Sequence, residues 1–208
     1  MAGHDDTEHD HDTVVHWDAD PDLFPRFQRA LDLLGKDKEE EAVAEFLALA
    51  ERGSSRAMMQ LGWQLEVGEG SSPNLTEVEQ WYRRAAAGGA IDAHYYLGDL
   101  LWRQHRFDEA YEAFRAGTEL GHVLSISRLA SMLFRGEGAV KNLGQARKLW
   151  ERASAMGHMP SRRHLGIYSL QGRFGFSRIP VGLPLLWSAM TGFLSVLRRN
   201  PDSDLLRQ

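Results

Sequence analysis

The residues whose types and spacing best suit metal chemistry are four histidines near the N-terminus, interleaved with aspartates: His4, His9, His11 and His16. Neutral imidazoles together with carboxylates chelate Zn²⁺, Ni²⁺ or Cu²⁺. A flexible segment must lose conformational entropy to close around an ion, however, and acidic histidine-rich tails are usually solvated. We therefore expect residues 1–21 to form a disordered acidic tail and predict no metal site, with chelation and an interaction tail as the alternatives.

General acid or base chemistry is the second use that histidines allow, and the sequence gives it little support. His94, His105 and His164 have no carboxylate, serine or cysteine partner at a recognisable spacing. His122 and His158 each follow a glycine at equivalent places of a repeat, which is typical of residues that begin a helix. The chain lacks Gly-x-Ser-x-Gly and His-Glu-x-x-His motifs, and its Gly-Glu-Gly segments do not continue into a nucleotide-binding fingerprint. We predict a protein that is not an enzyme and uses no cofactor.

The composition excludes further classes of function. Cysteine is absent, which excludes disulfides and thiolate metal sites and fits a reducing cytoplasm, the location that we expect. Residues 1–25 carry eight acidic side chains and no lysine or arginine, which leaves 21 of the 29 acidic residues against all 24 basic ones in the rest of the chain. Because that basic excess is small, we predict no nucleic-acid partner.

Residues 179–197 are the stretch to be weighed as a membrane span. These nineteen residues carry no charge and precede two arginines, so their length admits a tail anchor. Two prolines, two glycines and three small polar residues within the stretch keep its mean apolarity modest: Pro180, Pro184, Gly182, Gly192, Ser188, Thr191 and Ser195. The N-terminus lacks the basic and apolar regions of a secretory signal. We expect a buried or capping helix at 179–197, disfavour a membrane partner, and keep the anchor as the alternative.

A repeating architecture has to position these residues, because four columns of residues recur with one uneven period. Successive members of each column are 36, 32 and 36 residues apart. The columns hold a leucine, a glycine, an aromatic residue and a small or β-branched residue: Leu61, Leu97, Leu129, Leu165; Gly53, Gly89, Gly121, Gly157; Phe46, Tyr82, Phe114, Trp150; and Ala42, Val78, Ala110, Ala146. Four columns that share one uneven period indicate a repeat protein.

Each unit of the repeat is predicted to be two helices joined by a turn. On the first helix, small residues and a leucine form one stripe at helical spacing, which lets two helices approach closely. On the second helix, the aromatic residue fills the space between neighbouring units, and the column glycine supplies the positive φ that ends the helix. Residues 103–107 connect two helices directly, which explains the step of 32.

We therefore predict an all-α fold, a right-handed α/α superhelix (solenoid) of about five helix–turn–helix units within residues 22–208. The predicted units, followed by a C-terminal cap, are 22–53, 54–89, 90–121, 122–157 and 158–195. A two-helix unit alone buries too little apolar area to offset its loss of conformational entropy, so the units must stack on one another.

Three of the units resemble Sel-one-like repeats, whose pattern runs small-x-x-x-Leu-Gly, then Gly-x-Gly, then Trp-Tyr-x-x-Ala-Ala-x-x-Gly. The second unit matches closely, with Ala57, Leu61, Gly62, Gly68, Gly70, Trp81, Tyr82, Ala85, Ala86 and Gly89. The fourth unit carries the same pattern, the fifth departs from it most, and the third is closer to a tetratricopeptide repeat. The resemblance implies a solenoid that assembles protein complexes, with the first helices of its units lining a concave groove.

Eleven residues beside the packing stripe of the first helices form the predicted partner-binding groove: Gln60, Trp63, Gln64, Tyr96, Asp99, Arg103, Arg128, Met132, Arg135, His164 and Tyr168. Tryptophan, tyrosine, methionine and arginine are enriched at protein interfaces. We expect about half of the eleven to be exposed, and the arginines favour an acidic ligand, for which the acidic tail itself is a candidate.

The predicted function is a scaffold or adaptor that binds a peptide or protein in this groove. The alternative is an immunity or inhibitor protein that neutralises a toxic enzyme, and an enzyme is the least supported class. The identity of the partner and the oligomeric state stay open.

Overall fold

A computed structural model of the protein describes residues 23–67, 74–175 and 179–199. Within these ranges the chain forms ten α-helices and no β-strand: α1 (Leu23–Leu34), α2 (Glu39–Glu51), α3 (Ser55–Val67), α4 (Leu75–Ala87), α5 (Ala93–Arg103), α6 (Phe107–Glu119), α7 (Val123–Arg135), α8 (Leu143–Ala155), α9 (Met159–Leu170) and α10 (Ile179–Arg199). The histidines of the predicted tail and the glycine loop at 68–70 lie outside the described residues.

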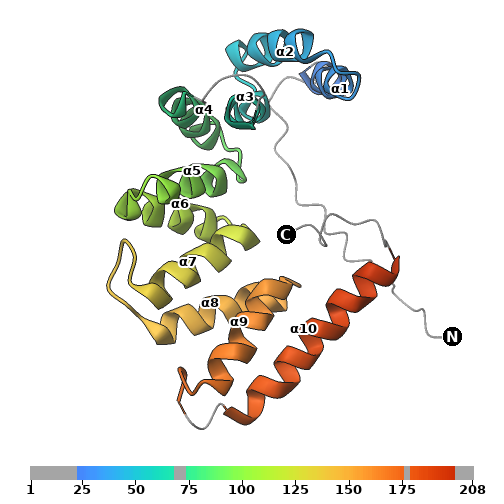
Figure 1. Cartoon of the computed structure of the whole chain (residues 1–208). Helices are drawn as coiled ribbons and strands as arrows, with labels where there is room; N and C mark the ends of the chain where they lie inside the picture. The colour runs from blue at the N-terminus through green and yellow to red at the C-terminus, as the bar shows by residue number, and fades with distance from the viewer. Residues whose placement is uncertain (1–22, 68–73, 176–178, 200–208) are drawn as a thin grey trace, which may run out of the picture.

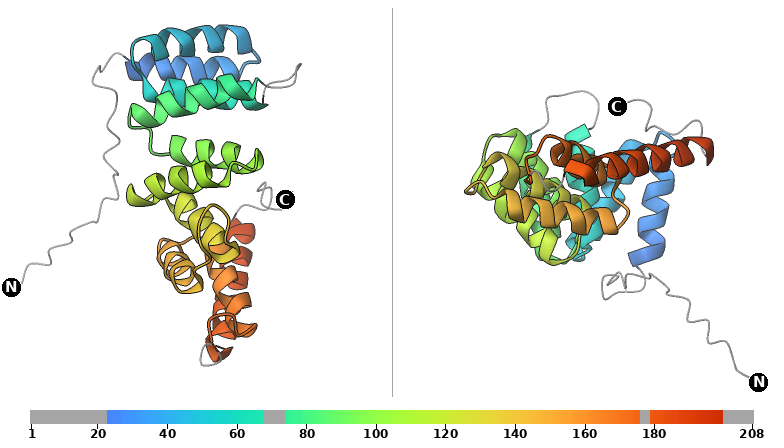
Figure 2. Two further views of the ribbon diagram at one scale, coloured as in Figure 1. Left: turned by 90° about the vertical axis from the view of Figure 1, so that its left-hand side faces the viewer. Right: turned by 90° about the horizontal axis from the view of Figure 1, so that it is seen from below.

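Consecutive helices pair, α1 with α2 through α9 with α10, and each pair packs on the next (Figure 1). Two further views show that α1–α4 and α8–α10 lie at opposite ends of a curved stack (Figure 2). A unit therefore packs chiefly on its neighbours along the chain, as in other solenoids. This arrangement confirms the predicted all-α repeat superhelix.

The glycines of the repeat end the second helices, as predicted. Gly53, Gly89, Gly121 and Gly157 have φ values of +93°, +93°, +82° and +87°. A side chain with a Cβ is strained in this left-handed region, which is why the position is glycine in every unit. The chain then turns back into the first helix of the next unit.

His122 and His158 begin helices α7 and α9, which confirms their structural interpretation. The Nδ1 atom of His122 accepts from the backbone N–H of Ser125 at 3.4 Å and lies 2.9 Å from its hydroxyl. His158 caps α9 in the same way through Ser161, at 3.3 Å and 2.8 Å. Each ring satisfies a backbone donor that the first helical turn leaves without a partner.

The aromatic column packs against the small residues of the first helices. All four of its rings are 0 or 1% exposed. A Cβ added to Gly62 would lie 2.6 Å from the ring of Tyr82, and one added to Gly98 would lie 2.7 Å from the ring of Phe114. The ring thus lies against its own unit, and Tyr82 also stacks on Tyr96 of the next unit at 5.7 Å between centroids. One side chain therefore joins two units.

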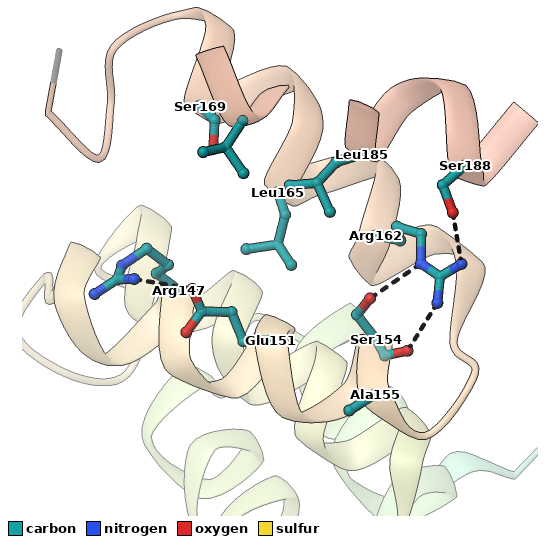
Figure 3. Close-up of a pocket in the computed structure, with 10 residues that line it drawn as sticks. Arg147, Glu151, Ser154, Ala155, Arg162, Leu165, Ser169, Leu185 and Ser188 are labelled. Atoms are coloured by element: carbon teal, nitrogen blue, oxygen red, sulfur yellow. Dashed lines mark hydrogen bonds and ion pairs between the residues drawn. The ribbon is translucent and has the colours of Figure 1, made fainter. Parts of the chain in front are cut away.

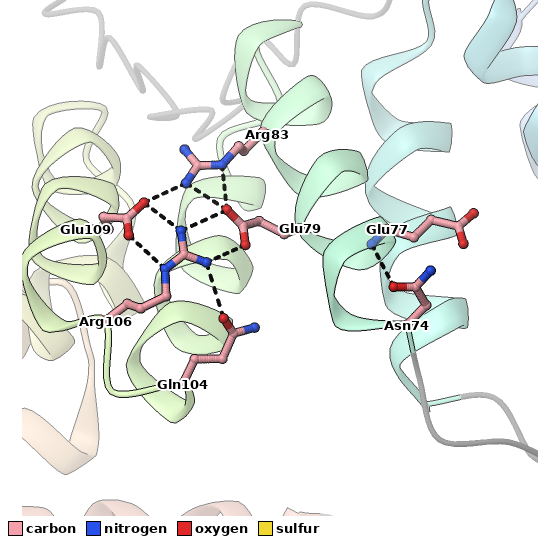
Figure 4. Close-up of polar contacts among 7 residues, drawn as sticks. All are labelled: Asn74, Glu77, Glu79, Arg83, Gln104, Arg106 and Glu109. Carbon is pink, nitrogen blue, oxygen red and sulfur yellow. Dashed lines mark hydrogen bonds and ion pairs between the residues drawn. The ribbon is translucent and has the colours of Figure 1, made fainter.

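A network of two glutamates and two arginines joins the second helices α4 and α6 (Figure 4). Glu79 lies 2.5 Å from Arg106 and 2.8 Å from Arg83. Glu109 lies 2.7 Å and 2.9 Å from the same two guanidinium groups. The hydrogen bond from Arg106 lowers the pKa of Glu79, against the rise that burial causes. The network therefore holds its charges at neutral pH and links the second unit to the third.

The last helix, α10, packs along α9 and leaves apolar side chains open on its other side. Leu183 and Trp187 are each 66% exposed. One unit earlier, 36 residues before, the equivalent positions are Arg147 and Glu151. The described end of the stack thus has an apolar edge where the preceding unit is polar. Among the described helices, none is long and apolar enough to cross a membrane.

Candidate protein-binding surface

The first helices of four units, α3, α5, α7 and α9, carry the eleven predicted groove residues. We call the face of these helices that bears them the first-helix surface. Trp63, Arg103 and Arg135 are exposed, Met132 is buried, and the other seven are partly buried. The structure therefore brings ten of the eleven to one accessible face, with fewer of them fully exposed than expected.

Met132 is a correction to the predicted groove. Its side chain is only 1% exposed and belongs to the core around Leu129, Leu133 and Trp150. Helix α7 lies in the middle of the stack, and eight of its 13 residues are buried. The face that it buries is therefore wider than that of a first helix in a terminal unit. A buried core side chain offers no contact area to a partner, and the prediction that Met132 contacts one is wrong.

A row of ion pairs crosses the first-helix surface from unit to unit. Glu66 on α3 pairs with Arg103 on α5. The Nε atom of Arg103 donates to Asp99 at 3.1 Å, and Arg128 on α7 donates to the other oxygen of Asp99 at 3.0 Å. The Tyr82 hydroxyl donates to Glu66 at 2.7 Å from beneath the row. Helices α3, α5 and α7 are thus joined by alternating charges.

Trp102 lies beside the α7 end of this row. The guanidinium groups of Arg128 and Arg135 lie 5.9 Å and 5.8 Å from its ring centroid, within range of cation–π attraction. Its Nε1–H donates to Glu137 at 2.9 Å, and Arg135 donates to the same carboxylate at 2.7 Å. Burial raises the pKa of Glu137, but the hydrogen bonds from Arg135 and Trp102 outweigh it and lower the pKa overall. All three predicted groove arginines therefore have carboxylate partners within the chain.

The N-terminal part of the first-helix surface is more open. Trp63 on α3 is 40% exposed, and Gln60 beside it is partly buried. Gln64 donates to Glu39 of α2 at 2.5 Å, while its amide oxygen is buried and makes no hydrogen bond within the described residues. Burial raises the pKa of Tyr96, with the Asp92 charge adding to the rise, so its hydroxyl stays protonated. This part offers aromatic rings and neutral polar groups to a partner.

The C-terminal part of the surface is an aromatic cluster. Tyr168 stacks on Phe134 at 4.2 Å and on Trp150 at 5.4 Å between ring centroids. His164 lies 5.0 Å from Trp150, and its Nδ1 atom is buried with no hydrogen-bond partner in the described part of the chain. Burial, with repulsion from Arg163, His158 and Arg135, lowers the pKa of His164 to about 4. The ring is therefore neutral at physiological pH and packs as an aromatic.

Three residues of the charged row escaped the sequence prediction, namely Glu66, Trp102 and Glu137. The repeat does hold a signal for the first, because Glu66, Trp102 and Phe134 share one column at steps of 36 and 32. A single carboxylate in an otherwise aromatic column indicates a polar contact. Glu137 is not part of this column, since it lies in the loop between α7 and α8. Among the described residues, no three His, Asp or Glu side chains lie close enough to hold a metal ion.

Two segments of the chain, 55–89 and 123–158, match the Sel1 repeat family. Among curated proteins, DAP3-binding cell death enhancer 1 of Rattus norvegicus is 28% identical over 118 residues, which cover 56% of this chain and 23% of that protein. The chain spans less than a quarter of the length of the curated relatives that it matches.

Solved structures share the architecture over most of the chain. A Sel1 repeat protein from Oxalobacter formigenes superposes with a TM-score of 0.69 at 21% identity, covering 80% of this chain and 73% of that one. The immunity protein Pa5087 from Pseudomonas aeruginosa superposes with a TM-score of 0.54 at 17% identity, covering 84% of this chain and 69% of that one. At these identities the likeness is one of fold.

Proposed function

The chain is an α-solenoid of the Sel1-like repeat family, and from this premise we propose that it is a protein-binding scaffold whose first-helix surface contacts a peptide or a folded protein. Sel1 repeats are a fold suited to protein interaction. Long, regular surfaces built from stacked units serve to bind extended partners. We also propose a cytoplasmic location, which the absence of cysteine supports.

The observation that carries the proposal is the composition of the accessible face between α3 and α9. Trp63, Tyr96 and Tyr168 are exposed or half-buried on it, and the ion-pair row separates them. Aromatic anchors next to a polar rim are the arrangement from which most binding energy at protein interfaces arises. Such a face favours a partner that inserts apolar side chains between the charged groups.

The charge of the partner is the finer part of the proposal. Arg103, Arg128 and Arg135 favour an acidic partner, but each already pairs with a carboxylate of the chain. An acidic partner must therefore exchange its carboxylates for Asp99, Glu66 or Glu137. The acidic residues 1–22 lie outside the described residues, and their contact with this surface stays a prediction.

An immunity or inhibitor role is the second candidate, and a specific likeness favours it. The fold of this chain is similar to that of immunity protein Pa5087, whose name states that role for that protein. Under this alternative the same first-helix surface would bind a toxic enzyme and block its activity. The two candidates differ in the partner's activity, which a binding experiment can measure.

The test starts from affinity capture with the full chain, followed by purification of each captured protein and reconstitution of a complex from the two pure components. The proposal expects a stable complex by calorimetry whose affinity falls when Tyr96 is replaced by alanine. Loss of the partner's enzymatic activity on binding would select the immunity role, and unchanged activity the adaptor role. A reconstituted complex with unchanged affinity in the Tyr96→Ala and Trp63→Ala variants would refute the proposed surface.

A further inference from the structure

A pocket of about 440 Å³ lies between α8, α9 and α10 (Figure 3). Leu165, Val181 and Leu185 form its apolar part. The polar part consists of Arg147, Glu151, Arg162 and three serines: Ser154, Ser169 and Ser188. None of the eleven groove residues lines the pocket, so it is separate from the first-helix surface.

Arg162 carries a positive charge that the rest of the pocket does not neutralise. Its Nε atom donates to the hydroxyl of Ser154 at 3.2 Å and its Nη2 atom to the backbone carbonyl of Ser154 at 3.3 Å. Its Nη1 atom donates to the hydroxyl of Ser188 at 2.9 Å (Figure 3). All three acceptors are neutral, and no carboxylate of the described residues lies within ion-pair distance of this guanidinium. Of its five N–H groups, two remain for a ligand.

The other two charges of the pocket cancel. Arg147 pairs with Glu151 one turn further along α8, at 2.8 Å. The pocket is thus left with the single net charge of Arg162, which is partly buried. A charge held away from water with only neutral partners is stabilised by an ionised acceptor more strongly than an exposed charge is. The pocket is therefore electrostatically suited to an anion.

Ser169 adds a second unused polar group. The residue is only 4% exposed and lines the pocket from α9. Its hydroxyl makes no hydrogen bond within the described ranges. Ser169 lies about two helical turns from Arg162 on α9, so its hydroxyl is available to a polar group at the other end of a ligand.

Comparison with the preceding unit shows that these polar groups are particular to this junction. At the equivalent positions, 36 residues earlier, apolar Ile126 and Leu133 stand in place of Arg162 and Ser169, and the long side chain of Arg152 stands in place of Ser188. Ile126 and Leu133 are 0 and 3% exposed and fill the equivalent space. The equivalence extends to α10, because Leu186 lies against Gly166 as Phe114 lies against Gly98.

An arginine bonds the equivalent backbone carbonyl at both junctions, but it comes from a different helix in each. At the earlier junction, Arg152 of the second helix donates to the backbone carbonyl of Thr118 at 3.3 Å. At the later junction that contact is made from the first helix, by Arg162 to Ser154. Because Ser188 is much shorter than Arg152, space opens in front of the guanidinium of Arg162. The substitutions together turn a filled contact into a charged pocket.

We propose that this pocket binds a carboxylate attached to an apolar stem, as a peptide presents at its C-terminus when its last side chain is that of leucine or valine. Arg162 donates its two remaining N–H groups to the carboxylate. The apolar stem contacts Leu165, Val181 and Leu185. The proposal does not depend on the first-helix surface, and its test needs no protein partner.

The test is a titration of the ¹⁵N-labelled full chain with N-acetyl-leucine, followed by NMR through the Arg162 Nε–H resonance and the backbone amides of Ser169 and Ser188. We expect saturable shifts at these groups. The Arg162→Leu variant, which restores an apolar residue like Ile126, should bind at least about tenfold more weakly, since it loses charge-assisted hydrogen bonds. The matched control is Arg163→Leu, an exposed neighbour outside the pocket, which should bind like the parent protein.

Two further ligands and one further variant make the result decisive. N-acetyl-leucinamide has the same stem without the charge, and equal binding of the acid and the amide would overturn the proposal. Inorganic phosphate has charge without a stem, and phosphate binding as tight as that of N-acetyl-leucine would overturn the apolar part. If circular dichroism shows that Arg162→Leu is unfolded, Arg162→Gln takes its place, because glutamine keeps a hydrogen-bond donor near Ser154 and Ser188 but removes the charge. Unchanged N-acetyl-leucine binding by folded Arg162→Gln would contradict the assigned site.

Discussion

Asp99 on α5 accepts a hydrogen bond from Arg128 on α7 at 3.0 Å, and this bond carries the charged row of one unit over to the next. Asp99 also accepts from Arg103, which in turn pairs with Glu66 on α3. The first-helix surface therefore alternates in charge over three units, whereas the sequence analysis considers only the groove arginines, which favour an acidic ligand. A partner has to match this alternation or displace the internal carboxylates.

Replacing Asp99 with asparagine tests which of these applies. The change leaves Arg103 and Arg128 with one carboxylate fewer, so an acidic partner should bind more tightly and a basic partner more weakly, by about 1 kcal/mol in either direction. Folding stability should change by less than about 1 kcal/mol, because these ion pairs are largely solvated. Calorimetry at low and high salt measures the binding effect. Glu112→Gln, the same charge change on α6, is the control and should leave affinity unchanged.

Replacing Gly98 with alanine should destabilise the fold. The added Cβ would lie 2.7 to 2.9 Å from three ring atoms of Phe114, and that ring is 1% exposed and cannot move into solvent. We expect a net loss of about 1–2 kcal/mol, even though alanine favours a helix over glycine by about 1 kcal/mol. Urea denaturation measures the difference. Gly144→Ala, at an open helical position with its nearest neighbour at 3.6 Å, should be neutral or stabilising.

The repeat explains why much of the fold is predictable from the sequence and why part of the surface is not. The positive φ of Gly121 and the buried ring of Phe114 follow from columns that every unit shares, because each unit solves the same packing problem. Met132 shows the limit of this reasoning. Its column is partly exposed at Gln64 and Tyr168, nearer the ends of the stack, but Leu100 and Met132 in the middle are each 1% exposed, which the spacing of residues does not reveal.

Side-chain networks between units were the least predictable feature. Glu79 and Arg106 are 27 residues apart and meet only because α4 and the turn before α6 lie side by side. Trp102 and Glu137 are 35 residues apart, close to one repeat length. Helical spacing within one segment relates neighbours three or four residues apart, so it cannot indicate such pairs. Such pairs become predictable only once it is known which helices of neighbouring units lie side by side.

His164→Phe should make the protein less sensitive to acid. An unfolded histidine has a pKa of about 6.5, whereas that of native His164 is lowered to about 4. Between these pH values the unfolded chain binds a proton that the native chain does not, so stability falls as pH falls from about 6.5 to about 4. The phenylalanine variant lacks this loss, which we expect to be on the order of 1–2 kcal/mol because solvent screens the partly exposed ring.

Thermal melting of both proteins between pH 7 and pH 4 measures this effect. The pKa values of His94, His122 and His158 are lowered by burial as well, so both proteins should lose stability in acid. The difference between the two curves isolates His164. Parallel curves over the whole range would mean that His164 binds its proton equally well in the folded and unfolded chains.

The most direct test of the scaffold function compares two exposed tryptophans with a purified partner. Trp63 lies on the first-helix surface at 40% exposure, and Trp187 lies on α10 at 66% exposure. Truncation of an interface tryptophan typically costs about 2 kcal/mol or more. Trp63→Ala should therefore weaken the complex by at least about thirtyfold in calorimetry while Trp187→Ala leaves its affinity unchanged. Full affinity in Trp63→Ala with a loss confined to Trp187→Ala would contradict the account and move the binding site to the end of the stack.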